Sequence, residues 1–88
     1  MIGDITNDNI GLYMELSQGY IVNKAPKTES PSTQRACAHN LAHYNERTCT
    51  FAHSDQAIKF YAPTLQEART EAQRRWPDLP FKECEFCR

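Results

Sequence analysis

Cysteine and histidine side chains are the groups in this chain best suited to bind a metal ion, and most of them lie close together. Two of the four cysteines and all three histidines fall within residues 37–53. Four of them follow the spacing C-x5-H-x5-C-x3-H: Cys37, His43, Cys49 and His53. Thiolate and imidazole are the usual ligands of tetrahedral structural zinc, and two of each complete a site. The stretch therefore predicts a structural Zn2+ centre made of these four residues.

A second arrangement uses the cysteines near the end of the sequence. Cys84 and Cys87 form a Cys-x2-Cys pair, which is the tight chelating turn of zinc knuckles. They can complete one site with Cys49 and His53. The regular spacing over residues 37–53 favours the first set of four ligands. The second set is favoured because it gives the Cys-x2-Cys pair a role, so both sets stay open. His39 is left out of both sets, because a histidine of this kind is more often simply exposed.

The elements that would position these ligands follow from hydrophobic patterning. Apolar residues alternate over 57–62, which is typical of a half-buried strand. A helix is predicted over 65–75, because apolar residues recur there at helical spacing, Thr64 is a good N-cap and Glu67 completes a capping box. Residues 81–83 predict a short strand. The C-terminal half is therefore expected to be a β-α-β unit.

The beginning of the chain predicts a β-hairpin. Apolar residues alternate from Ile10 to Leu16, and a second β-type run follows a glycine-containing loop. A helix over residues 9–18 is the alternative, because several of the same side chains also share one helical face. We expect the hairpin.

A polar stretch with two prolines, residues 24–36, separates the hairpin from the metal-binding sequence and predicts a linker or mobile loop. The chain then divides into a hairpin segment at 1–23, this linker, and a zinc-binding α+β domain at 37–88. Because 88 residues bury little apolar surface, such a domain is marginally stable without a staple. The expected fold is a small, zinc-stapled α+β domain.

One part of the metal-binding sequence resembles a known family. Residues 48–54, TCTFAHS, are similar to the closing half of a CCCH-type zinc finger, which ends with Cys, three residues including an aromatic, and His. The upstream spacing also fits, with His43 standing where the family has its second cysteine. The resemblance covers residues 37–53, with Ser54 directly after them, and nothing else in the chain.

The resemblance implies that the chain binds single-stranded RNA, as CCCH-type fingers do. Phe51 would then stack on a base, and Tyr44 would be a second stacking residue. Arg47 and Lys59 would contact phosphates, which would make the binding dependent on salt. Burial of Phe51 under the metal as part of a small core is the alternative.

Two binding functions remain open from the sequence. The first is a zinc-stabilised module that binds RNA. The second is a zinc-stapled protein-interaction module, such as a small viral or phage-type protein that inhibits a larger protein machine. Exposure of Phe51, Tyr44 and Arg47 would favour RNA, and their burial would favour a protein partner. The net charge of −1 decides nothing, because RNA binding needs only a local basic patch.

Other functional classes are not expected. A chain of this length has little room for a substrate pocket, so we expect neither an enzyme nor a small-molecule substrate. No apolar run reaches the length of a membrane span, and the acidic opening is unlike a secretory signal. The cysteines are therefore expected as thiolates in a reducing intracellular compartment, cytoplasm or nucleus, with disulfides as the alternative.

Overall fold

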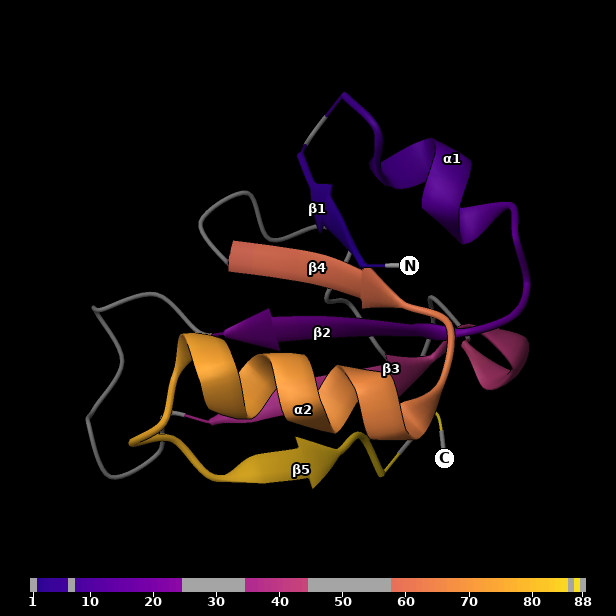
Figure 1. Cartoon of the computed structure of the whole chain (residues 1–88). Coiled ribbons are helices and arrows are strands. Elements are labelled where there is room, and N and C mark those ends of the chain that lie inside the picture. Colours follow the sequence, from indigo (N-terminus) through magenta and orange to yellow (C-terminus); the bar gives the residue numbers. More distant parts are fainter. Residues whose placement is uncertain (1, 7, 25–34, 45–57, 86, 88) are drawn as a thin grey trace.

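The architecture is a five-stranded sheet with strand order β1-β4-β2-β3-β5 (Figure 1). A computed structural model describes residues 2–6, 8–24, 35–44, 58–85 and 87. The elements in chain order are β1 (Gly3–Ile5), α1 (Ile10–Met14), β2 (Tyr20–Lys24), β3 (Ala36–Asn40), the 3-10 helix η1 (Leu41–His43), β4 (Ile58–Ala62), α2 (Leu65–Arg75) and β5 (Phe81–Glu83). The predicted α+β class is confirmed.

The central strand β2 pairs antiparallel with both β3 and β4. On the outside of the sheet, β1 pairs antiparallel with β4, and β5 pairs parallel with β3. Strands from both sides of the predicted linker therefore lie in one sheet. Lys24 and Ala36, at the two ends of that linker, are opposite one another in the β2–β3 pair, and residues 25–34 lie outside the described part.

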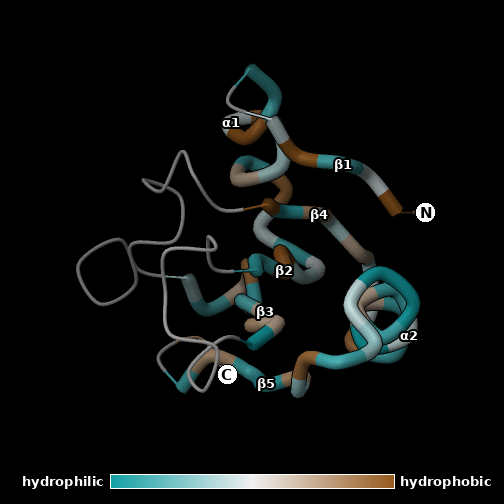
Figure 2. Tube along the Cα trace, turned by 90° about the vertical axis from the view of Figure 1, so that its left-hand side faces the viewer, coloured by the Kyte–Doolittle hydropathy of each residue, from teal (hydrophilic) through white to brown (hydrophobic). Residues whose placement is uncertain are grey.

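One face of the sheet is covered by α2 (Figures 1 and 2). Val22 stands opposite both Ala38 and Phe60, and all three are at most 2 % exposed. Ala68 and Ala72 of α2 complete this core. Because methyl side chains predominate on both surfaces, the helix backbone can approach the strands closely.

The predicted β-α-β unit is confirmed as β4, α2 and β5. Helix α2 begins as its sequence predicts, because the backbone N–H of Glu67 donates to the Oγ1 atom of Thr64 at 3.2 Å. At its other end, Trp76 packs against Phe60, with ring centroids 5.9 Å apart. Since β3, β4 and β5 all run antiparallel to β2, the unit connects two parallel strands that are not neighbours.

The predicted N-terminal hairpin is wrong at its first strand, because Ile10–Met14 form the helix α1. Asn9 organises the turn before the helix: its Oδ1 atom accepts from the Thr6 N–H at 2.7 Å, and its Nδ2 atom donates to the Asp4 carbonyl at 3.0 Å. Tyr13 then stacks on Tyr61 of β4, with the two ring centroids 5.0 Å apart. These contacts select the helical alternative, which the alternating pattern alone did not exclude.

Neither helix among the described residues combines the length and the apolar character that crossing a membrane requires.

An ion-pair network joins α2 to the first strand. Glu71 accepts from Nε of Arg74 at 2.9 Å and from Nε of Arg75 at 2.6 Å, and Arg75 also reaches the Asp4 carboxylate at 2.6 Å. The hydrogen bond from Arg74, followed by that from Arg75, lowers the pKa of Glu71 from 4.5 to about 2. The ionised carboxylate therefore stabilises the folded state.

The Glu71→Gln variant should have a lower thermal midpoint than the wild type at pH 7. The contribution of Glu71 is complete above its ordinary pKa of 4.5 and is lost as the pH falls towards 2, where the folded carboxyl titrates. The gap between the two proteins should therefore narrow over that interval in thermal unfolding at a series of pH values.

The matched control is Asp78→Asn, which removes one negative charge from an exposed turn. Any loss of metal in acid affects all three proteins and cancels in the differences between them. A gap between wild type and Glu71→Gln that is the same at every pH would contradict the assignment.

Candidate metal centre

Three metal-binding side chains meet on the face of the sheet opposite α2. The ligand atoms of Cys37, His39 and Cys84 all lie within 4.8 Å of one another. Cys37 and His39 are two residues apart on β3, so their side chains project from the same face. Cys84 is brought beside them because β5 runs parallel to β3, and the Cys84 N–H extends the pairing by donating to the Ala38 carbonyl at 2.8 Å.

The second cysteine of the Cys-x2-Cys pair also lies at this cluster. The Cys87 N–H donates to the Cys84 carbonyl at 3.3 Å, which closes the tight turn between them. The Sγ atom of Cys87 lies 3.7 Å from the Nδ1 atom of His39, and the residue is completely buried. The turn therefore directs both of its thiols towards β3.

The orientation of His39 is set by Asn23 on β2. Its Nε2–H donates to the Oδ1 atom of Asn23 at 2.6 Å, which leaves the lone pair of Nδ1 facing the thiols. Burial, with a smaller effect from the nearby charge of Arg35, lowers the pKa of His39 to about 4. The ring is therefore neutral at pH 7, which is the form that binds metals.

The separation between Cys87 and His39 fits a tetrahedral metal ion. With metal–sulfur bonds of about 2.3 Å and metal–nitrogen bonds of about 2.0–2.1 Å, neighbouring ligand atoms lie about 3.5–3.8 Å apart. The distance of 3.7 Å between Cys87 and His39 is in this range, and the ligand atoms of Cys37, His39 and Cys84 lie within 4.8 Å of one another. Small side-chain movements would therefore bring Cys37, His39 and Cys84 onto one ion, and Cys87 contacts this group through His39.

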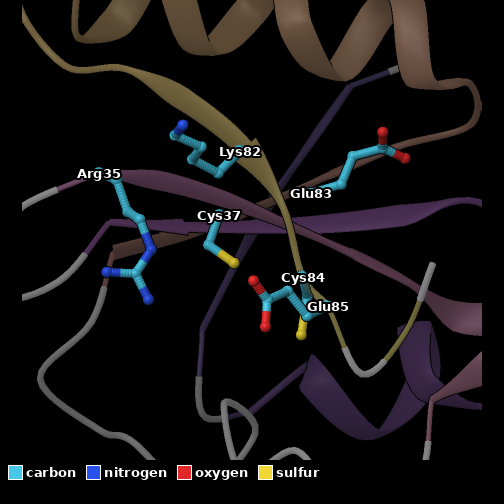
Figure 3. Close-up of a pocket in the computed structure, with 6 residues that line it drawn as sticks. All are labelled: Arg35, Cys37, Lys82, Glu83, Cys84 and Glu85. Carbon is cyan, nitrogen blue, oxygen red and sulfur yellow. The ribbon is translucent and has the colours of Figure 1, made fainter.

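A cavity of about 400 Å³ borders the cluster. Figure 3 shows the side chains that line it: Arg35, Cys37, Lys82, Glu83, Cys84 and Glu85. Two of the six are cationic and two are anionic, so the charges of the lining balance one another.

The ligands predicted from sequence spacing are divided differently by the structure. Cys37 and Cys84 come from different predicted sets and lie together, while Cys49 and His53 are outside the described residues, so neither set is tested as a whole. His43 is exposed on η1, and its Nδ1–H donates to the Cys87 carbonyl at 3.1 Å.

Sequence reasoning missed His39 as a member of the cluster. The signal that could have found it is the Cys-x-His spacing from Cys37, because alternate residues share a face wherever the backbone is a strand. That signal is useful only once residues 36–40 are known to form a strand, and the sequence prediction assigned no strand there.

The residues predicted to contact RNA are partly within the described part of the chain. Lys59 is buried in the sheet, with 6 % of its surface exposed. Tyr44 is half-buried and packs against the cluster that contains Ile21, Leu41 and the two cysteines of the turn. Phe51 and Arg47 lie outside the described residues.

Comparison of the chain with protein-family models, with curated proteins and with solved structures finds no match. The resemblance of residues 48–54 to a CCCH-type finger therefore has no support from a family model, and these residues lie outside the described part. The geometry of the Cys and His cluster is accordingly the main guide to the function of this protein.

Replacing His39 should weaken metal binding strongly. His39→Ala removes a nitrogen ligand, so the affinity of the protein for Zn2+ should fall by roughly 100-fold or more. Mutating a residue that only orients a ligand already lowers metal affinity by about 10–100-fold. Competition with a chromophoric chelator measures this affinity in the wild type and the variant.

His53→Ala is the discriminating control. It should bind Zn2+ as the wild type does if the cluster is the site, whereas both ligand sets predicted from the sequence require His53. Loss of metal from His53→Ala together with normal binding by His39→Ala would exclude the cluster as the metal centre.

Proposed function

We propose that the protein is a zinc-stapled binding module, in which Zn2+ fastens the segment after β5 to strand β3. The observation that carries this proposal is the meeting of Cys37, His39 and Cys84 on one face of the sheet. Thiolate and imidazole donors are the ligand set of structural zinc, an ion that brings no redox chemistry of its own. We propose no catalytic role.

The packing of the domain supports the need for such a staple. Five of the seven buried residues in the core under α2 are alanines, at positions 36, 38, 62, 68 and 72. Each alanine buries little apolar surface, so this core contributes less than one of larger side chains. Structural zinc contributes about 10–16 kcal/mol in small domains, which is comparable with the whole stability of a typical protein.

Removal of the metal should therefore unfold at least the C-terminal half of the chain. An excess of chelator at neutral pH is expected to lower the thermal midpoint and reduce the sheet signal in circular dichroism, and added Zn2+ should restore both. Unchanged spectra and an unchanged midpoint after complete removal of zinc would contradict the stapling role.

The surface around α1 favours a protein as the partner. Leu12 and Leu16 are 69 % and 50 % exposed, and Leu16 borders a cavity of about 320 Å³ that is also lined by Tyr13 and Tyr61. Residues 1–23 contain three acidic side chains and no basic one. Of these, Asp4 is paired with Arg75 of α2, while Asp8 and Glu15 flank α1 in sequence. An apolar patch next to such acidic residues is complementary to a protein surface that presents apolar and basic side chains.

RNA is the second candidate, and the sequence TCTFAHS at 48–54 is the observation that favours it. Asp8 and Glu15, which flank α1 in sequence, would repel phosphates, and Lys59 is buried. We therefore place a protein partner first. A small inhibitor of a larger protein machine, of viral or phage type, fits this description. Zinc binding requires free thiolates, which favours a reducing compartment inside the cell.

The partner class can be tested without knowing the partner. A displayed library of random peptides is selected for binding to the immobilised, zinc-loaded protein. Selected peptides should combine basic with large apolar residues. They should bind the Leu12→Asp, Leu16→Asp double variant at least about tenfold more weakly, because losing the apolar contacts should cost at least about 1.4 kcal/mol of binding free energy, which corresponds to a tenfold change in Kd.

The matched control is Gln66→Asp, Gln73→Asp, which adds the same charge at exposed positions of α2. A parallel titration uses a single-stranded RNA of mixed sequence. Peptides that bind both double variants equally would exclude the α1 surface. RNA binding that weakens with salt and is lost in Phe51→Ala would replace the protein partner with RNA.

A further inference from the structure

Cys87 has the environment of a metal ligand. Its thiol is completely buried, and both of its backbone groups are held: the N–H by the Cys84 carbonyl and the carbonyl by the His43 ring. A buried thiol that is fixed in this way 3.7 Å from an imidazole nitrogen does more than pack, because a small apolar side chain would fill the same space without a polar contact.

The distance from Cys87 to His39 specifies which nitrogen is the ligand. Sulfur and nitrogen atoms bound to one tetrahedral zinc lie about 3.5–3.6 Å apart, close to the observed 3.7 Å to Nδ1. The other nitrogen, Nε2, is occupied by its hydrogen bond to Asn23. Only Nδ1 therefore has a lone pair available in this arrangement.

Asn23 is well placed to control this choice. It lies on β2 directly opposite Cys37 of β3, so the regular register of the sheet fixes the position of the acceptor. Metal-bound histidines commonly donate their second N–H to such an acceptor, which orients the ring and makes it a better ligand. Asn23 does not reach the metal itself and acts through His39.

We infer that the centre is a closed Cys3His site, with the thiolates of Cys37, Cys84 and Cys87 and the Nδ1 atom of His39 as ligands and Asn23 as a positioning residue. This inference rests on the proposed zinc function and specifies its ligands. Three thiolates and one Zn2+ carry a net charge of −1, and the neighbouring cavity presents two cations, Arg35 and Lys82, together with Glu83 and Glu85. Four protein ligands leave no open position for a water molecule, so the site is structural.

Replacing Zn2+ with Co2+ allows the number of cysteine thiolates bound to the metal to be measured by absorption spectroscopy. The sulfur-to-cobalt charge-transfer absorption grows with the number of bound thiolates, and its intensity should correspond to three in the wild type. Cys87→Ser should reduce it by about one third, the share of one thiolate in three. Cys49→Ser, which removes a thiol outside the proposed set, should leave it unchanged.

A second measurement needs no variant of a ligand and so does not depend on how well the variants fold. Correlation of ring protons with ring nitrogens by NMR in the zinc-loaded wild type should show Nδ1 of His39 bound to metal and Nε2 protonated. Asn23→Ala should weaken zinc binding by roughly 10–100-fold, and Asn23→Asp, which keeps an acceptor, should recover part of the loss. A merely structural Asn23 would leave the ring signals of His39 unchanged.

The outcomes separate this inference from the proposed function. Tight zinc binding with two thiolates, an unchanged spectrum in Cys87→Ser, or coordination through Nε2 would overturn the ligand set and leave the zinc-stapled module intact. Absence of zinc binding by the wild type would remove both. Three thiolates, Nδ1 coordination and the dependence on Asn23 together support the closed site.

Discussion

The parallel pairing of β3 with β5 is the constraint on which the candidate metal centre depends. It carries the chain beyond β5 to the face that holds Cys37 and His39, and the Cys84 N–H prolongs it by one more hydrogen bond to β3. Without this register, the thiols of Cys84 and Cys87 would have no fixed relation to the residues of β3. The proposed metal bond would in turn stabilise this edge of the sheet, because among the described strands β5 pairs with β3 alone.

The two faces of the sheet are used in different ways. The face under α2 is apolar and made of small side chains, and it contributes packing. The opposite face carries Asn23, Cys37 and His39, together with the buried Lys59. Since alternate residues of a strand project to opposite faces, the same short strands supply both a core and a metal centre. A chain of 88 residues forms few strands, so using both faces of each strand lets it build the two features in one sheet.

Local patterns predicted local structure well and long-range pairing poorly. The helix α2 and strand β4 follow from periodicity and from the Thr64 cap, which act over a few residues. The segment Ile10–Met14 was ambiguous, because its apolar residues fit two periods, and contacts with a distant strand through Tyr61 decided the outcome. Of the cluster, Cys37 and Cys84 were identified as ligands but were assigned to different sites. Spacing along the chain contains no information about which strands become neighbours, so it could not place Cys84 beside Cys37. His39 was missed because no strand was predicted over residues 36–40.

The strand order also has a consequence for the way the chain folds. β1 and β2 are consecutive in sequence but are separated in the sheet by β4, which comes more than thirty residues after β2. Among the described strands, β1 pairs only with β4, so it cannot join the sheet until β4 has been synthesised and has paired with β2. Closing such a long loop before any contact is gained slows folding. Assembly of the sheet on the ribosome should accordingly begin with the β2–β3 pair, and the N-terminal strand should be among the last parts to become ordered.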